Sequence, residues 1–243
     1  MKLDVLAFGA HPDDVELGCS GLLLVEKANG KKTGIVDLTR GELGTRGTAE
    51  IRKEEAAAAE IILGVDVRLN LGMADAFFEN NETNQRKIIT VLRKYCPEII
   101  VINAPEDRHP DHGRGAQLLS DSAFFSGLSK IETFEDGVLQ KPWRPKYVFN
   151  YIQDRYLKPD FVVDISSVID KKVASIKAYS TQFFNPDAKE ETQTYISTPA
   201  FLDGIIARSA LFGKTIGVEH AEGFISKKTI GFKNLDAFIL QNT

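Results

Sequence analysis

Apolar residues follow two patterns through the first half of the chain: short runs rich in apolar residues, and longer stretches at helical spacing. The apolar-rich runs predict a buried strand over residues 3–9 and further strands over 33–39, 65–71 and 98–104. The helical spacing predicts helices over residues 15–29, 49–63, 84–95 and 114–126, with Thr48 as a helix cap. Apolar strands alternating with helices are typical of a mostly parallel sheet covered on both faces, a three-layer α/β/α fold.

The second half of the chain is less regular. Strand patterns occur at 146–152, at 161–165 and, with loop, over 218–232. Ser167 and Asp170 form a capping-box pattern that predicts a helix to about residue 182. Thr198 followed by Pro199 predicts the start of another helix. Because no linker or repeat divides the chain, we expect one domain over residues 1–243.

Composition narrows the class of protein. The chain has 243 residues, 43% of them hydrophobic, and a formal net charge of −4, which gives no support for nucleic-acid binding. No apolar run approaches the ~20 residues of a membrane helix, and the amino terminus does not resemble a signal peptide. We therefore expect a cytoplasmic protein without a membrane or nucleic-acid partner. Cys19 and Cys96 are expected to be reduced core thiols.

Three of the four histidines lie in two short, similar segments. His11-Pro12-Asp13-Asp14 follows the first predicted strand, and His109-Pro110-Asp111-His112 follows the fourth. In a doubly wound sheet with strand order 3-2-1-4-5, these two strands are neighbours at the point where the order reverses. Ligands bind there, outside the carboxyl ends of the strands. We therefore expect the two segments to face each other across one crevice.

The residue types in this crevice fit a catalytic metal site. His11, Asp14 and His112 would give three ligands and leave a position open for water, as in catalytic zinc sites. Zinc is favoured, one ion per chain, and Fe²⁺ is the alternative. Asp13 is the spare carboxylate and the natural general base, although Asp13 and Asp14 could exchange roles.

His109 and Asp111 complete the candidate chemistry. They are two residues apart in a stretch expected to be extended, so their side chains can lie on one side. Such a pair would raise the pKa of the imidazole, and protonated His109 could stabilise an oxyanion or protonate a departing amine. The structural alternative is that each segment is only a helix cap or a turn with a satisfied histidine.

The two histidine segments resemble known motifs. Residues 10–16 (AHPDDVE) and 109–112 (HPDH) resemble the paired signatures of the PIG-L/LmbE-like zinc N-deacetylases, and the resemblance extends over essentially the whole chain. It implies a Rossmann-like fold, one zinc ion and removal of the N-acetyl group from a GlcNAc-type sugar. By motif position, it implies His11, Asp14 and His112 as ligands, Asp13 as base, and His109, beside Asp111, as the residue assisting the tetrahedral intermediate.

Within that family, the GELGTRG loop (residues 41–47) and the segment 219–224 look most like the bacillithiol-biosynthesis deacetylases. This likeness implies N-acetylglucosaminyl-L-malate as substrate and a homo-oligomer, often a hexamer. A mycothiol-type precursor or a chitooligosaccharide is the alternative substrate. A non-catalytic Rossmann-like sugar- or nucleotide-binding protein is disfavoured, because HPDDVELG stands where a GxGxxG phosphate loop would be.

Several residues are candidates for binding such a substrate. Arginine suits a carboxylate, and three arginines lie on or beside loops that face the expected crevice. The polar segment 185–197 has the character of a lid. The candidates are Arg46, Arg52, Arg108, Glu42, Tyr195 and His220. For each of them, a surface or packing role is the competing interpretation.

Overall fold

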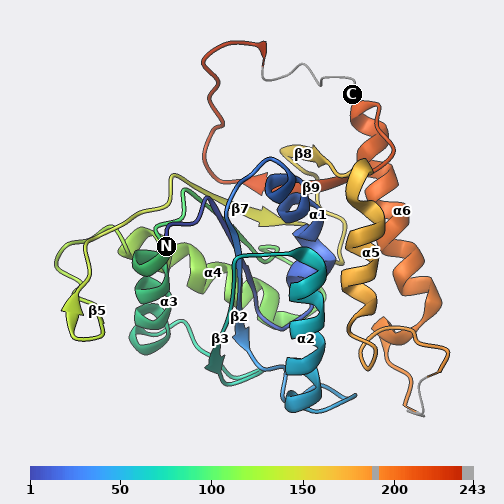
Figure 1. Cartoon of the computed structure of the whole chain (residues 1–243), viewed down its shortest axis with the longest axis horizontal. Coiled ribbons are helices and arrows are strands. Elements are labelled where there is room, and N and C mark those ends of the chain that lie inside the picture. Colours follow the sequence, from blue (N-terminus) through green and yellow to red (C-terminus); the bar gives the residue numbers. More distant parts are fainter. Residues whose placement is uncertain (188–191, 237–243) are drawn as a thin grey trace.

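The computed structural model describes residues 1–187 and 192–236, and its centre is a seven-stranded sheet (Figure 1). The strand order is β3-β2-β1-β4-β7-β9-β8. The strands are β1 (Val5–Gly9), β2 (Thr33–Thr39), β3 (Val67–Met73), β4 (Ile99–Ile102), β7 (Tyr147–Tyr151), β8 (Phe161–Asp164) and β9 (Ala221–Ser226). The part of the segment 185–197 at 188–191, and the carboxyl-terminal residues 237–243, lie outside the described residues.

The first five strands in this order are parallel and confirm the predicted arrangement. β1 lies between β2 and β4, with Val5 aligned to Thr33 on one side and to Ile99 on the other. The other edge differs from a wholly parallel sheet, because β9 pairs antiparallel with both β7 and β8. A hairpin of β5 (Phe134–Glu135) and β6 (Val138–Leu139) was also not predicted, and it stands apart from the sheet (Figure 1).

Helices cover both faces of the sheet, which confirms the three layers (Figure 1). The helices are α1 (Asp14–Ala28), α2 (Ala49–Leu63), α3 (Glu82–Tyr95), α4 (Pro110–Phe125), α5 (Ile169–Lys177) and α6 (Pro199–Ile216). α3 and α4 pack on one face through Leu6, Phe8 and Ile102, whereas α1 and α2 pack on the other through Val5, Ala7 and Val101. The side chains of alternate β1 residues thus pack on opposite faces of the sheet. α5 and α6 extend the second layer.

The helix ends confirm some cap predictions and correct others. Thr48 Oγ1 accepts the Ile51 N–H at 3.3 Å, and Thr198 caps α6. The Ser167–Asp170 capping box does not form: a short 3₁₀ turn precedes α5, and the helix ends at Lys177 rather than near 182. α4 begins at Pro110, four residues before its predicted start, so the second histidine segment enters a helix.

Two further expectations concern the cysteines and the membrane. Cys19 and Cys96 are both free thiols, Cys19 buried and Cys96 half-buried. Over residues 1–187 and 192–236, every helix is too short or too polar to cross a lipid bilayer.

Candidate metal and catalytic site

The turn between β1 and α1 carries the first histidine segment in a strained conformation. Asp13 has φ 120° and ψ −23°, a region that residues with a side chain rarely adopt. A Cβ atom at Gly9 would lie 2.9 Å from the His11 carbonyl oxygen, so the tight approach requires glycine there. Strained residues cost about 1–3 kcal/mol each and cluster at functional sites. The strained backbone at Asp13 therefore indicates that this turn belongs to a functional site.

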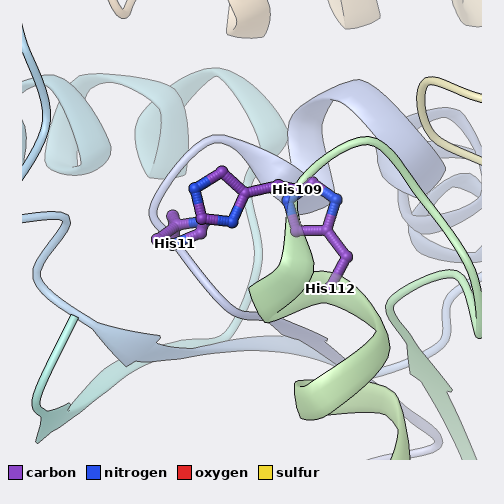
Figure 2. A group of neighbouring side chains, drawn as sticks. All are labelled: His11, His109 and His112. Carbon is purple, nitrogen blue, oxygen red and sulfur yellow. The ribbon is translucent and has the colours of Figure 1, made fainter. Parts of the chain in front are cut away.

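The two histidine segments meet, as expected from the strand order. Figure 2 shows His11, from the turn after β1, beside His109 and His112 at the start of α4. The ring centroid of His11 lies 4.7 Å from that of His109 and 5.8 Å from that of His112. One ring nitrogen from each histidine lies within 4.8 Å of the others, close enough for a shared metal ion.

Asp14 lies between two of these histidines. Its Oδ1 is 3.1 Å from His112 Nε2, and its Oδ2 is 3.6 Å from His11 Nδ1. Side-chain amides of Gln153 and Asn103 donate to it at 2.6 and 3.0 Å, which fixes the carboxylate in the crevice. Although burial opposes ionisation, His112 and His11 hold the pKa of Asp14 well below its ordinary value.

The outward nitrogen of each of these histidines contacts another carboxylate. His112 Nδ1 is 2.6 Å from Asp107, and His11 Nε2 is 3.1 Å from Asp75 and 3.3 Å from Asp111. Metal-binding histidines use such outer carboxylates to fix ring orientation and tautomer. His11, Asp14 and His112 therefore fit a divalent cation both in donor type and in their supporting partners.

These carboxylates also favour the protonated, positively charged form of the two imidazole rings when no cation is present. Against the effect of burial, Asp14 and Asp107 raise the pKa of His112 to about 9. Asp111, Asp14 and Asp75 likewise raise the pKa of His11 well above its ordinary value. Because a cation binds the unprotonated ring, it must displace these protons.

Zinc binding to the metal-free protein at pH 7 is therefore expected to release about two protons. Calorimetric titration in two buffers of different ionisation enthalpy measures this number directly. Asp107→Ala is the control: it keeps both rings but removes a carboxylate that raises the pKa of His112, so fewer protons should be released. An observed heat that does not depend on the buffer would contradict the prediction.

Asp13 has the properties of a general base. Its side chain is buried, and burial together with neighbouring Asp14 raises its pKa to about 7 despite the opposing charge of Arg52. Arg52 Nη1 lies 3.3 Å from Asp13 Oδ2 and 3.2 Å from the Pro12 carbonyl oxygen. A base with a pKa near the working pH is the most effective proton acceptor.

The structure corrects the expected relation between His109 and Asp111. His109 is the N-cap of α4 and Asp111 lies in the first helical turn, and the Asp111 carboxylate faces His11, Arg114 and the Ala76 N–H. Burial, with the nearby His11 and His112, lowers the pKa of His109 instead of raising it. The Asp111 N–H donates to His109 Nδ1, so the neutral ring carries its hydrogen on Nε2. His109 is thus a neutral hydrogen-bond donor.

The expected substrate residues divide into two groups. Arg46, Arg52, Arg108 and Tyr195 line a cavity of about 270 Å³ that also contains the histidines. Glu42 is exposed, is not among the lining residues and accepts the Asp75 N–H. His220 lies elsewhere, with Nδ1 2.9 Å from Ser209 Oγ. The structure therefore brings four of the six to the cavity.

Tyr195 and Arg108 form the cavity rim together with a residue that sequence reasoning missed. The Arg108 guanidinium lies 4.7 Å from the centre of the Tyr195 ring. Asp154 accepts hydrogen bonds from both side chains at 3.2 Å. Asp75, Asp107 and Gln153 were missed as well. Two of these, Asp75 and Gln153, follow the carboxyl end of a parallel strand, a position that marks ligand sites in such sheets.

Comparison with known proteins points to one family. Residues 6–123 match the PIG-L family, described as GlcNAc-PI de-N-acetylase. The crystal structure of the conserved protein TT1542 from Thermus thermophilus is 35% identical, with a TM-score of 0.83, over 95% of this chain and 97% of that one.

Two curated relatives carry different names. Diacetylchitobiose deacetylase of Thermococcus kodakarensis is 28% identical over 90% of this chain and 81% of its own length. The 4-oxalmesaconate hydratase of Pseudomonas putida is 23% identical over 90% of this chain and 85% of its own length. Proteins similar to this chain over most of its length thus include one named a deacetylase and one named a hydratase.

Proposed function

Because the chain belongs to the PIG-L family, we propose that it is a metal-dependent hydrolase that removes the acetyl group from a small N-acetylated amino sugar. The observation that carries the proposal is the meeting of Asp13 with the His11–Asp14–His112 set in one cavity. Such a set binds a divalent cation, for which zinc is our assignment and Fe²⁺ the alternative.

The chain's own residues account for the proton movements of amide hydrolysis. Asp13 takes a proton from the attacking water as oxygen adds to the acetyl carbon, and it passes that proton to the nitrogen as the C–N bond breaks. Acetate and a free amine result. The Nε2–H of His109 donates a hydrogen bond to the oxygen of the tetrahedral intermediate. A bound divalent cation supplies a Lewis acid that polarises the acetyl carbonyl.

The part of the substrate beyond the sugar has two candidates. Arg46 and Arg108 in the cavity lining favour an acidic group, such as the malate of N-acetylglucosaminyl-L-malate. Tyr195 at the rim, 57% exposed, favours a second sugar ring, as in diacetylchitobiose, the compound named for the Thermococcus relative. Arg108 already pairs with Asp154, which lowers its availability to a carboxylate.

An assay of acetate release from a panel of N-acetylglucosaminides tests both levels of the proposal. The panel contains the malate conjugate, diacetylchitobiose and an uncharged small glycoside, each with the zinc-loaded protein. Acetate from at least one of them supports the deacetylase, and the ratio of kcat/KM values identifies the aglycone. Hydration of an unsaturated carboxylic acid without any acetate release would favour the chemistry named for the Pseudomonas relative.

Replacing Arg52 with glutamine is expected to move the acidic limb of the kcat/KM profile to higher pH by about one unit. The arginine charge favours the Asp13 carboxylate, so its removal raises the pKa of that base, which then ionises only at higher pH. Arg52→Lys keeps the charge and is the matched control. A limb that stays in place in Arg52→Gln would show that Asp13 does not set it.

A further inference from the structure

Helix α1 is broken six residues after the strained Asp13. Cys19 has φ −150° and ψ 18°, which is not helical, inside a helix that otherwise runs from Asp14 to Ala28. The break separates a lead segment, residues 14–18, from the remainder of the helix. A helix break leaves carbonyl groups without partners on one side and N–H groups without partners on the other.

A buried lysine binds the carbonyl groups at the end of the lead segment. Lys172 Nζ, from α5, donates to the carbonyl oxygens of Glu16 and Leu17, both at 2.9 Å. Its side chain is only 2% exposed. A positive charge at the carboxyl end of a helical segment also matches the direction of the helix dipole.

A buried glutamate binds the N–H groups on the other side of the break. Glu222, from β9, accepts the N–H of Gly21 at 2.9 Å and that of Leu22 at 2.7 Å. Lys172 Nζ lies 2.7 Å from the same carboxylate, so the two residues form a buried ion pair inside the break. A negative charge at the amino end of the second segment again matches the helix dipole.

Glycines on both sides of the break leave room for this arrangement. A Cβ atom at Gly18 would lie 2.2 Å from the Tyr151 ring. A Cβ atom at Gly21 would lie 2.7 Å from the Ile165 side chain and 2.9 Å from Glu222 Oε1. Lys172 and Glu222 thus place two opposite charges at the break, and the glycines leave the space that the surrounding side chains need.

A buried ion pair is a poor source of stability, because apolar residues of similar size often do as well. Its position in α1 gives it another role. We propose that Lys172 and Glu222 are positioning residues that set the orientation of the lead segment, and with it Asp14 relative to His112. The proposal rests on the proposed function only in taking Asp14 as a metal ligand. α1 packs against both α5 and β9, so these elements hold the segment from outside the cavity.

The double variant Lys172→Met/Glu222→Met tests this role, since it removes both charges and leaves no unpaired one. Zinc affinity of the metal-free protein, measured by competition with a chelator, is expected to fall about tenfold, the lower range for residues that orient metal ligands. The thermal midpoint should fall, because methionine leaves the two carbonyl and two N–H groups at the break without these partners. kcat should fall, and KM should change little.

The control is Lys27→Met/Asp66→Asn, which removes an ion pair from the same helix beyond the break. Zinc affinity should be unchanged in this control. A folded Lys172→Met/Glu222→Met protein with the zinc affinity of the parent overturns the proposal.

A third variant keeps the proposal testable if the double variant does not fold. Glu222→Gln retains one oxygen to accept an N–H and is expected to give a smaller loss of zinc affinity, with faster hydrogen exchange at Gly21 and Leu22. Parental zinc affinity in Glu222→Gln together with that faster exchange would overturn the proposal. Because zinc affinity is measured without substrate, a failure of the deacetylase assay leaves this result standing and refutes only the proposed function.

Discussion

Replacing His112 with alanine is expected to abolish zinc binding and deacetylation together. His112 Nε2 lies 3.1 Å from Asp14 Oδ1, so the ring supplies one of the three nitrogen and oxygen donors that converge there. Removing a ligand should weaken zinc binding by more than the 10- to 100-fold typical of losing an outer partner. Zinc content after dialysis and the rate of acetate release measure the two effects.

Asp107→Ala is the matched comparison for His112→Ala. It leaves the ligand in place and removes only the carboxylate 2.6 Å from His112 Nδ1. We expect zinc affinity to fall about 10- to 100-fold, and activity to return when zinc is supplied in excess. If His112→Ala retained one zinc per chain, the assignment of His112 as a ligand would be wrong.

The parallel half of the fold could be predicted because its strands are buried on both faces. β1 and β4 are apolar throughout, and β2 is buried along its whole length, so short apolar-rich runs between clear helices identified these strands. β9 could not be recognised as a sheet strand with the same ease, because it contains Glu222 and Gly223. The Glu222 carboxylate is buried in the break of α1. No local sequence pattern indicates that its partner is Lys172, 50 residues earlier in the chain.

The start of α4 was placed too late for a related reason. Helical spacing of apolar residues begins only near Ala116, because the first turn faces the cavity and is made of Pro110, Asp111 and His112. Polar residues that face the site occupy this first turn, so the apolar spacing by which a helix is recognised is absent there. The strand-to-helix position still placed these residues correctly at the edge of the sheet.

The inner residues of the site were easier to predict than their supports. His11, Asp14 and His112 belong to two recognisable motifs, whereas Asp75 and Asp107 lie in loops outside both motifs, where acids are common. Lys172 is harder still, since lysine is almost never fully buried unless it is paired. Its partner and its role follow only from the three-dimensional arrangement of α1, α5 and β9.

Asp13→Asn is expected to keep zinc and lose about 10²- to 10⁴-fold in kcat. The amide has nearly the shape of the carboxylate but cannot accept the proton of water, while His11, Asp14 and His112 remain. Zinc content and kcat, measured on one preparation, separate the two roles. If Asp13→Asn lost zinc while Asp14→Asn kept it, the base and the ligand would be exchanged.

Asp13→Gly and Asp13→Ala add a test of the strained backbone, because only glycine adopts φ 120° without a penalty. Both variants lose the base and should be equally inactive. Glycine loses more chain entropy on folding, yet relief of the strain should leave the glycine variant more stable than the alanine variant by about 1 kcal/mol. Urea unfolding of the metal-free proteins measures the difference. Equal or lower stability of Asp13→Gly would mean that the turn stores no strain, and that the carboxylate is held at the site by Arg52 and its neighbours alone.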